Sequence, residues 1–504
     1  MNEITFSTKQ LNAIDTIVKF ALNKDTKNIA ITLTGSAGTG KTTIVKEIRN
    51  RLMQQGHNVI LLAPTNKARI ILQTACNALK SYTIHSFLGL KPITQIANYD
   101  ANNIMFVDED DVKETSGLVI IDECSMIEDT LYDKLIDFAK QYECKILFVG
   151  DIKQLTPVEN KNGEKSKSFT GNNVIELTEI FRQKEDNKIL PILQTLRDNV
   201  ITDFKTNINT NKDGGIVIRD SYSKFVDSAV KAFSTDTVKS TKILAFSNNT
   251  VSTYNKKIFN KLFPNSDNKF PKGCILTGYR NVKIQGTNII NNSSDYVVLE
   301  STKKTKRFKC NVKDVNNFEN VTDKYIPLDG YSVKLQEIIN GKLIGNAFNV
   351  FIHDSSDIKL MSLLCKEHAY RRNMKYEDAI LDNSAMFDME AQIINTHDWR
   401  DIDNIKRCEC KKALDYGYAS TVHKAQGSTY ENIFIDVDEI CQGTRRLNKE
   451  TRRELLYTGL SRTKHFAYIL PYISSKYNIN LIKYKLNRVK NNIIIKIKQK
   501  YIKH

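Results

Sequence analysis

The chain has 504 residues, enough for about three to four domains of ordinary size. Hydrophobic residues make up 41%, so globular cores can form, while 74 Lys and Arg against 57 Asp and Glu leave a net charge of +17. This excess favours a polyanion as partner, although a generally lysine-rich surface explains it equally well. The polar start, Met1–Gln10, predicts no signal peptide, and no apolar run is long enough to predict a membrane-spanning helix.

The nine cysteines are scattered and show no metal-binding pattern. Cys408 and Cys410 form the one close pair, and a single intervening residue is the wrong spacing for a zinc knuckle. A dispersed, odd-numbered set predicts reduced thiols and therefore a cytoplasmic protein, in the host cytoplasm if the source is viral.

The first third of the chain alternates apolar strands with helical stretches, which predicts a parallel sheet flanked by helices. The expected strands are residues 28–34, 58–63, 118–121 and 145–149, with helices ending near 55 and spanning 66–79. Residues 83–117 break this rhythm, because they are polar and carry an acidic run from Asp108 to Asp111. They are interpreted as a small insertion.

The alternation returns in a second α/β domain that is split along the sequence. Its expected elements are a strand at 242–246, a helix at 250–262, and strands at 432–437 and 465–470 around a helix near 450–460. Between them, residues 271–411 alternate like strands at first and look helical from 357 to 407. The last residues, 476–504, carry nine Lys or Arg and no acid, which fits a frayed basic helix or a disordered tail.

The most specific motif is a phosphate-binding loop between the first strand and its helix. The residues run Gly35-Ser36-Ala37-Gly38-Thr39-Gly40-Lys41-Thr42 and continue into Thr43. Glycines let backbone N–H groups converge on phosphate oxygens, and the following helix directs its positive end at the same anion. Lys41 is predicted to reach the β- and γ-phosphates of ATP, and Thr42 to ligate Mg²⁺.

Acidic and amide side chains follow the later strands of the same domain. Asp122 and Glu123 end the apolar strand Val119–Ile121, so Asp122 is predicted to hold Mg²⁺ and Glu123 to deprotonate the attacking water. Gln154 follows the next strand and is placed to sense the γ-phosphate.

Two arginines are candidates for stabilising charge on the transferring phosphoryl group, Arg182 and Arg462. A guanidinium suits this task because it is planar, always charged and forked. The second α/β domain has no phosphate loop of its own, since Gly341-Lys342-Leu343 lacks both the first glycine and the threonine. We therefore expect ATP in a cleft shared by both domains.

The ordered set of motifs resembles superfamily 1 helicases, in the branch represented by RecD and the phage Dda helicases. Besides the residues above, the match rests on Ala63–Ala68, Thr83–Phe87, Asp122–Met126, Gly150–Val158, Phe246–Asn248, Ala419–Gly427 and Leu456–Thr463. The resemblance implies two RecA-like parallel-sheet domains, a pin insertion in the first, and an SH3-like β insertion with a helical extension in the second. The domains expected from it are 1–82 with 118–172, the pin at 83–117, 173–270 with 412–475, the β insertion at 271–411, and the tail.

The resemblance also implies an activity, namely ATP-dependent translocation on single-stranded DNA with five-prime-to-three-prime unwinding, in replication, recombination or repair. It assigns adenine recognition to Gln10, upstream of the first helix. DNA contacts are implied for Thr65, Asn66, His85, Phe87, Phe106, Asn248, Thr421, His423 and Lys424. For His85 and His423 the alternative is a hydrogen bond at a helix start, and for Phe106 a core position in the pin rather than a wedge between bases.

Other functions stay open on the sequence alone. A translocase that displaces proteins without strong unwinding, an RNA helicase, and a RecA-type recombination module all use the same loop. The last of these needs arginines from another subunit, whereas Arg182 and Arg462 lie in one chain, which predicts a working monomer. Single-stranded and forked DNA are the expected partners, with a single-strand-binding protein or replisome components as further candidates and no membrane.

Overall fold

The structure is a computed structural model that describes fourteen segments of the chain. These are residues 5–25, 27–92, 106–108, 117–157, 164–179, 189–198, 208–211, 214–236, 240–284, 287–309, 325–353, 393–395, 412–444 and 449–471. Arg182, most of the predicted helical extension and the basic tail lie outside these segments.

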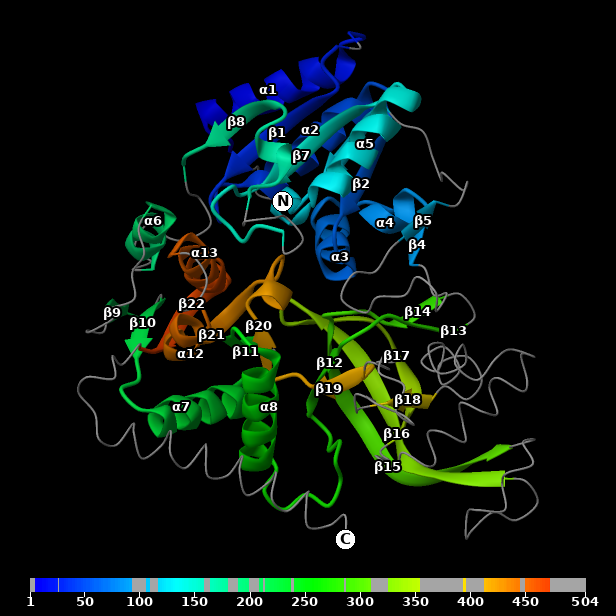
Figure 1. The fold of residues 1–504 in the computed structure, drawn as a ribbon, viewed down its shortest axis with the longest axis vertical. Coiled ribbons are helices and arrows are strands. Elements are labelled where there is room, and N and C mark those ends of the chain that lie inside the picture. Colours follow the sequence, from blue (N-terminus) through cyan, green and yellow to red (C-terminus); the bar gives the residue numbers. More distant parts are fainter. Residues whose placement is uncertain are drawn as a thin grey trace.

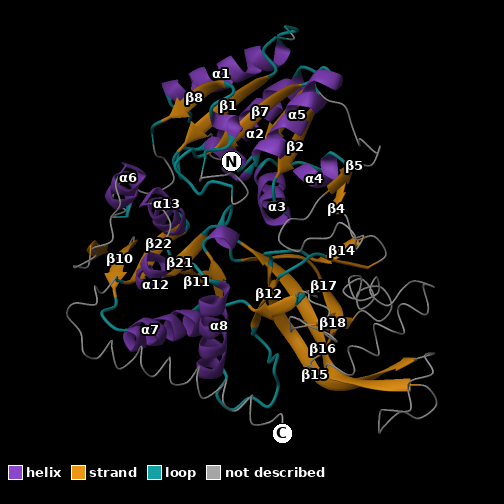
Figure 2. Ribbon diagram, viewed as in Figure 1, coloured by secondary structure: helices purple, strands orange, loops and turns teal. Residues whose placement is uncertain are grey.

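The first domain is a six-stranded parallel sheet covered by helices (Figures 1 and 2). Its order is β3 (Tyr82–Thr83), β2 (Val59–Ala63), β6 (Leu118–Ile121), β7 (Lys145–Gly150), β1 (Ala30–Gly35) and β8 (Asn173–Leu177). The helices are α1 (Thr8–Leu22), α2 (Lys41–Gln54), α3 (Asn66–Ala75), α4 (Ile84–Phe87) and α5 (Asp129–Gln141). Every residue of β6 is buried, because a central strand of a parallel sheet has helices over both faces.

The second domain contains another six-stranded sheet. Its order is β20 (Ala419–Thr421), β11 (Thr241–Ala245), β21 (Tyr430–Asp436), β22 (Thr463–Leu470), β10 (Gly214–Ile218) and β9 (Ile208–Asn211). All neighbours are parallel except β9 and β10. The helices are α6 (Leu190–Asp198), α7 (Tyr222–Thr235), α8 (Asn248–Leu262), α12 (Val437–Gly443) and α13 (Lys449–Leu460).

The predicted β insertion is a third six-stranded sheet built from long hairpins. Its order is β18 (Ile393–Asn395), β17 (Lys342–His353), β16 (Tyr325–Ile339), β15 (Asp295–Lys309), β12 (Ile275–Gly278) and β19 (Leu414–Tyr416). Only β17 and β18 are parallel among these pairs. Two small ribbons accompany the main sheets, β13 (Val282–Ile284) with β14 (Thr287–Ile290), and β4 (Leu90–Pro92) with β5 (Phe106–Asp108).

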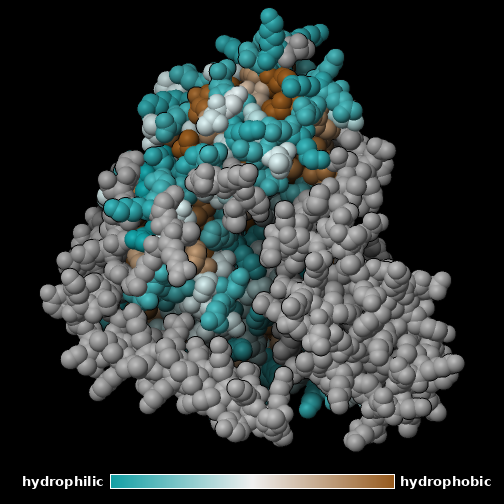
Figure 3. Space-filling view, viewed as in Figure 1, coloured by the Kyte–Doolittle hydropathy of each residue, from teal (hydrophilic) through white to brown (hydrophobic). Residues whose placement is uncertain are grey.

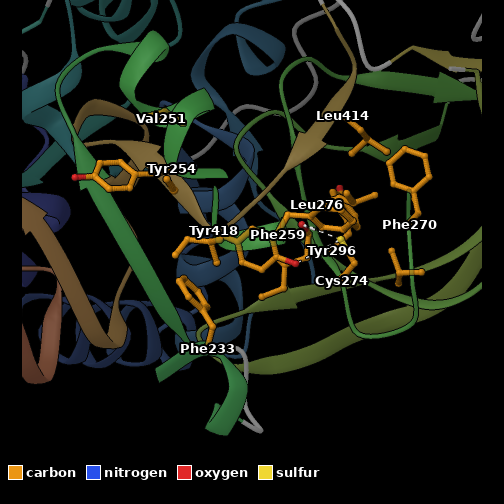
Figure 4. Packing of buried hydrophobic residues seen from close by; sticks show 14 of the residues in the cluster. Phe233, Val251, Tyr254, Phe259, Phe270, Cys274, Leu276, Tyr296, Leu414 and Tyr418 are labelled. Carbon is orange, nitrogen blue, oxygen red and sulfur yellow. Dashed lines mark hydrogen bonds between the residues drawn. The ribbon is translucent and has the colours of Figure 1, made fainter. Parts of the chain in front are cut away.

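One hydrophobic cluster joins the second domain to the β insertion. Figure 4 shows Phe233, Phe259 and Tyr418 of the domain packed toward Cys274 and Tyr296 of the insertion. The Tyr418 hydroxyl lies 3.5 Å from the Cys274 sulfur, and both side chains are buried. Because separating these parts would expose a continuous apolar core, the domain and its insertion form one body.

Three predicted domain boundaries are wrong. Strand β8 pairs with β1 in the first sheet, so the first domain extends past residue 172 to Leu177. Strand β3 pairs with β2, which places the start of the pin insertion after α4 and not at residue 83. Strand β19 pairs with β12, so the β insertion continues past residue 411 to Tyr416. Each misplaced strand is an edge strand of two to five residues, too short for its pattern to reveal its sheet.

On the face seen in Figure 3, the described part of the first domain is mostly hydrophilic, with several hydrophobic spots. Across the described segments, no helix combines the length and apolar character that crossing a bilayer requires.

Candidate nucleotide-binding site

A pocket of about 310 Å³ opens where β1, β6 and β7 end. The carboxyl ends of parallel strands are the usual ligand-binding edge of such a sheet. The pocket is lined from the first domain by Ala37, Gly38, Gly40, Lys41, Thr42, Thr43, Ala68, Ile71, Asp122, Glu123, Gly150, Asp151 and Gln154. The other wall consists of Asn340, Gly427, Thr429 and Arg462, so the site lies between the domains.

The phosphate-binding loop has the backbone that its sequence predicts. Gly38 and Gly40 have φ of 92° and 85°, in the region that favours glycine. A Cβ atom at Gly40 would lie 2.7 Å from the Gln10 side-chain nitrogen. The Lys41 ammonium donates to the carbonyl oxygens of Gly35 (2.8 Å) and Ser36 (3.0 Å), which folds it back over the loop. Helix α2 begins at Lys41, so its free N–H groups face the pocket.

A hydroxyl and a carboxylate that could hold Mg²⁺ both line the pocket. Both Thr42 and Asp122 line it, and oxygen ligands suit this hard cation. Within the described segments, no group of three or more His, Cys, Asp or Glu could hold a metal by itself. Mg²⁺ usually takes one or two protein ligands and completes its shell with phosphates and water.

Glu123 is held in an unusual backbone conformation beside this pair. Its φ of 54° is left-handed, and its N–H donates to the Asp122 carboxylate at 2.9 Å. Such strain is concentrated at functional sites, where surrounding structure enforces it. The bend turns the Glu123 side chain into the pocket, where it can accept a proton from water.

Gln154 has a buried side chain with an unused hydrogen-bonding atom. It is 4% exposed, it lines the pocket, and among the described residues its carbonyl oxygen has no partner. A buried acceptor without a partner is costly, so a water or ligand hydrogen in the pocket fits there. This geometry agrees with a role beside the γ-phosphate and the attacking water.

The second domain contributes Arg462, which is 5% exposed. Its Nη1 atom lies 3.9 Å from Oε1 of Glu123 across the cleft. The guanidinium is oriented by donating to the Thr458 carbonyl (3.2 Å) and the Ser461 hydroxyl (3.0 Å). The predicted arginine finger Arg462 therefore lies beside Glu123, the predicted base, whereas Arg182 lies outside the described residues.

Three predicted nucleotide-binding residues shape the loop and do not line the pocket. The Gln10 amide accepts from the Ser7 N–H (3.0 Å) and donates to the Thr39 carbonyl (3.1 Å). The Thr39 hydroxyl donates to Ser36, and a Cβ atom at Gly35 would lie 2.7 Å from that hydroxyl oxygen. Adenine recognition by Gln10 stays a prediction.

The predicted DNA contacts in the first domain have different surroundings. Phe87 is fully buried and packs edge-on against Phe138, so the prediction that it contacts DNA is wrong in this conformation. A T-x-x-x-F pattern cannot show which side of a one-turn helix faces the core. Thr65 caps α3 by accepting from the Ala68 N–H at 3.2 Å. His85 is partly exposed, and the Phe106 backbone lies in β5.

In the second domain, Asn248 is exposed at the start of α8. Thr421 is buried, and its hydroxyl accepts from the Lys424 N–H. Burial lowers the pKa of His423, which favours a neutral ring at pH 7, so His423 is suited to hydrogen bonding more than to neutralising a phosphate. The Lys424 ammonium lies 3.8 Å from the centre of the Tyr279 ring.

Sequence reasoning missed several residues of the far wall. Gly427 has φ of 72°, and a Cβ atom there would lie 3.3 Å from Ala68 of the first domain. Asn340, with φ of 49°, occupies the turn between β16 and β17. The Asn340-Gly341 dipeptide signals a hairpin turn, but nothing in the sequence places that turn at the cleft.

One nucleotide loop between two parallel-sheet domains, with an arginine supplied by the second, defines a P-loop nucleoside-triphosphate hydrolase. The protein-family model for the AAA domain matches residues 6–219, and the family model for the UvrD-like helicase C-terminal domain matches residues 416–470. The ATP-dependent DNA helicase Dda of Enterobacteria phage T4 is 27% identical over 493 residues, covering 90% of this chain and 97% of Dda. RecD of Buchnera aphidicola is 28% identical over 475 residues, covering 87% of this chain and 69% of RecD.

An uncharacterised protein of Acanthamoeba polyphaga mimivirus is 26% identical over 502 residues, covering 91% of this chain and 98% of its own length. The crystal structure of Candida albicans Pif1 helicase matches with a TM-score of 0.47 and 16% identity, covering 96% of this chain and all of that one. The chain belongs to the superfamily 1 helicases, in the branch of RecD and Dda.

Removing the phosphate-gripping or water-activating group should abolish turnover without unfolding the protein. We expect Lys41→Ala and Glu123→Gln each to lower ATP turnover stimulated by single-stranded DNA by about 10²-fold or more, because Lys41 grips the reacting phosphoryl group and Glu123 activates the attacking water. Steady-state ATP hydrolysis measures this, and single-strand binding should survive. Glu143→Gln is the matched control, since Glu143 is exposed and has a similar φ of 48°. Wild-type turnover in either variant contradicts the assignment.

The arginine should matter more for turnover than for binding. We expect Arg462→Ala to lower the maximal rate by about 10³-fold while nucleotide affinity changes little, because the guanidinium stabilises transition-state charge. Nucleotide titration beside steady-state kinetics separates the two effects. Arg51→Ala, on helix α2, is the control. Equal losses in binding and rate would indicate a ground-state role for Arg462.

Proposed function

We propose that this protein is an ATP-driven motor that moves on single-stranded DNA from five prime to three prime and unwinds duplexes ahead of it. The observation that carries the proposal is the cleft itself, because Glu123 and Arg462 come from different domains and lie 3.9 Å apart. A site completed by two bodies couples hydrolysis to their relative position. The relative of similar length from phage T4 is an ATP-dependent DNA helicase.

Hydrolysis follows from the residues of the cleft. Thr42 and Asp122 would hold Mg²⁺, which would neutralise negative charge on the phosphates. Glu123 accepts the proton of the attacking water, and Gln154 helps to orient that water. Lys41 and Arg462 then stabilise the charge that develops on the transferring group. When the domains part, Arg462 leaves the site and the products can dissociate.

The DNA path is proposed to cross both domains. The first domain would contact DNA through Thr65, Asn66 and His85. The second domain would contact it through Asn248, Thr421, His423 and Lys424. Polar contacts to phosphates and occasional stacking on bases give binding that tolerates any sequence. Alternate gripping by the two domains, as the cleft closes and opens, yields net movement along the strand.

The proposal includes a working monomer in the cytoplasm. Arg462 reaches the site within one chain, so catalysis requires no second subunit. A single-strand-binding protein or replisome component is a further partner that suits a motor on exposed single strands.

A forked substrate tests the polarity of the proposed function directly. We expect a DNA fork with a five-prime loading tail to be unwound and one with only a three-prime tail to be left intact, both in the presence of ATP and Mg²⁺. Gel separation of the strands measures the product. ATP consumption without unwinding on either fork would favour a protein-displacing translocase. Activity restricted to an RNA loading strand would favour an RNA helicase.

The pin insertion should act on base pairs and leave hydrolysis intact. Phe106 lies in β5, which pairs with β4 beside α4 at the side of the first domain (Figure 1). An aromatic stacked on a base contributes about one to three kcal/mol, so we expect Phe106→Ala to keep much of its ATPase and lose most unwinding. The measurement is unwinding per ATP consumed. Leu79→Ala, at a residue 93% exposed on the same domain, is the control. An unchanged ratio would assign Phe106 to the core of the pin.

A further inference from the structure

Three charged side chains from three parts of the fold meet between the domains. Lys67 lies on α3 of the first domain, Lys242 on β11 of the second, and Asp295 at the start of β15 in the β insertion. Their exposures are 4%, 2% and 8%. The Asp295 carboxylate lies 2.7 Å from the Lys242 ammonium and 3.6 Å from that of Lys67. Buried charges are rare unless paired, so this contact is a specific feature of the interface.

Two of the three members, Lys242 and Asp295, are paired without any contribution from the first domain. Lys242 also donates to the Gly417 carbonyl at 2.6 Å, and Asp295 also accepts from the Thr277 hydroxyl at 2.5 Å. All of these residues belong to the second domain and its insertion, which share one hydrophobic core. Asp295 therefore keeps a cationic partner when the cleft opens.

Lys67 has no such partner within its own domain among the contacts of the described residues. Its ammonium meets Asp295 and the Tyr430 hydroxyl, the latter at 3.5 Å, and lies 5.6 Å from the centre of the Tyr430 ring. Burial disfavours its charged form, but the interactions with Tyr430 and Asp295 outweigh that effect and raise the pKa of Lys67 above its ordinary value. The protein partners of this ammonium among the described residues are thus in reach only when the two bodies are together.

The contact is close to the catalytic arginine. The Tyr430 N–H donates to the Arg462 carbonyl at 2.8 Å. Asp295 is paired in register with Ile338, two residues before Asn340, which lines the nucleotide pocket. A small hollow bordered by Lys67 and Asp295 shares Asn340 and Thr429 with that pocket. Movement of Lys67 relative to Asp295 is therefore movement of one wall of the nucleotide site relative to the other.

We propose that Lys67 and Asp295 are positioning residues for closure of the nucleotide cleft. Their contact forms when the first domain closes on the second and breaks when the domains part. Because Asp295 belongs to the β insertion, the contact makes the position of that insertion depend on the nucleotide. This inference rests on the ATP-driven closure proposed above. The alternative is a permanent bridge that holds the domains together in every state.

Charge reversal at Lys67 tests the contact. In Lys67→Glu the introduced carboxylate faces Asp295, and juxtaposed like charges oppose closure. Dyes attached through unnatural amino acids at Leu79 and Leu343, which are 93% and 54% exposed, report closure by energy transfer. The titrant is a non-hydrolysable ATP analogue with Mg²⁺. We expect the half-closure concentration and the KM for ATP to rise by about 10-fold or more, with kcat at saturation within about two-fold.

Matched variants make the result specific. Lys19→Glu makes the same charge change at an exposed site of the first domain and should leave half-closure unchanged. Adding Asp295→Asn to Lys67→Glu removes the like charge and leaves Lys242 facing the new carboxylate, so closure should be largely restored. If Lys67→Glu fails to fold, Lys67→Gln is the milder substitution, because it removes the charge without reversing it. We expect it to raise the half-closure concentration by about three-fold.

Two results would overturn the proposal. One is an unchanged half-closure concentration in both Lys67 variants while the wild type closes normally. The other is a fall in the unfolding temperature of nucleotide-free protein without any change in closure, which indicates a permanent bridge. A wild-type protein that fails to close with the ATP analogue would instead contradict the proposed function, together with the inference that rests on it.

Discussion

The contact on which the rest of the structure depends is the approach of Arg462 to Glu123 across the cleft, at 3.9 Å. A single domain could bind ATP with its loop and its Mg²⁺ ligands, but the developing charge would lack the guanidinium. In the proposed mechanism, hydrolysis therefore needs both sheets, and each hydrolysis event requires them to come together. The elements of the second domain that hold Arg462, strand β21 and helix α13, are in this sense part of the active site.

The interface between the first domain and the second domain with its insertion has the chemistry expected of an interface that can open. Contacts across it include the polar pairs Tyr457 with Asp151 (2.6 Å), Lys165 with Glu454, and Lys67 with Asp295, beside the apolar packing of Leu155. Polar groups regain hydrogen bonds from water when they separate, so parting costs less than exposing an apolar core of equal area. The β insertion and the second domain are instead joined by apolar packing and stay together. This difference in contact chemistry supports the proposal that the first domain moves relative to the second domain and its insertion.

Much of this arrangement could be predicted from the sequence, because its strongest signals are local. The glycines of the loop, the apolar strand Leu118–Ile121 and the acids after it predicted the first wall of the cleft. What failed depends on long-range packing. Edge strand β8 has the same composition whichever sheet it joins, and Phe87 shows no local sign of its burial. Asn340 reaches the pocket only because a hairpin more than two hundred residues from Asp122 folds against it.

The first turn of helix α3 shows how the nucleotide site, the predicted DNA contacts and the relative position of the domains can be coupled over a short distance. Successive residues on a helix point about 100° apart, so four neighbours face four directions. Thr65 caps the helix, Asn66 reaches Asn281 of the β insertion at 3.2 Å, Lys67 reaches Asp295, and Ala68 lines the pocket against Gly427. A rigid turn cannot move for one of these contacts and stay still for the others. A small rotation of α3 on closure would therefore alter the predicted DNA contacts, the buried charge pair and the nucleotide wall at the same time.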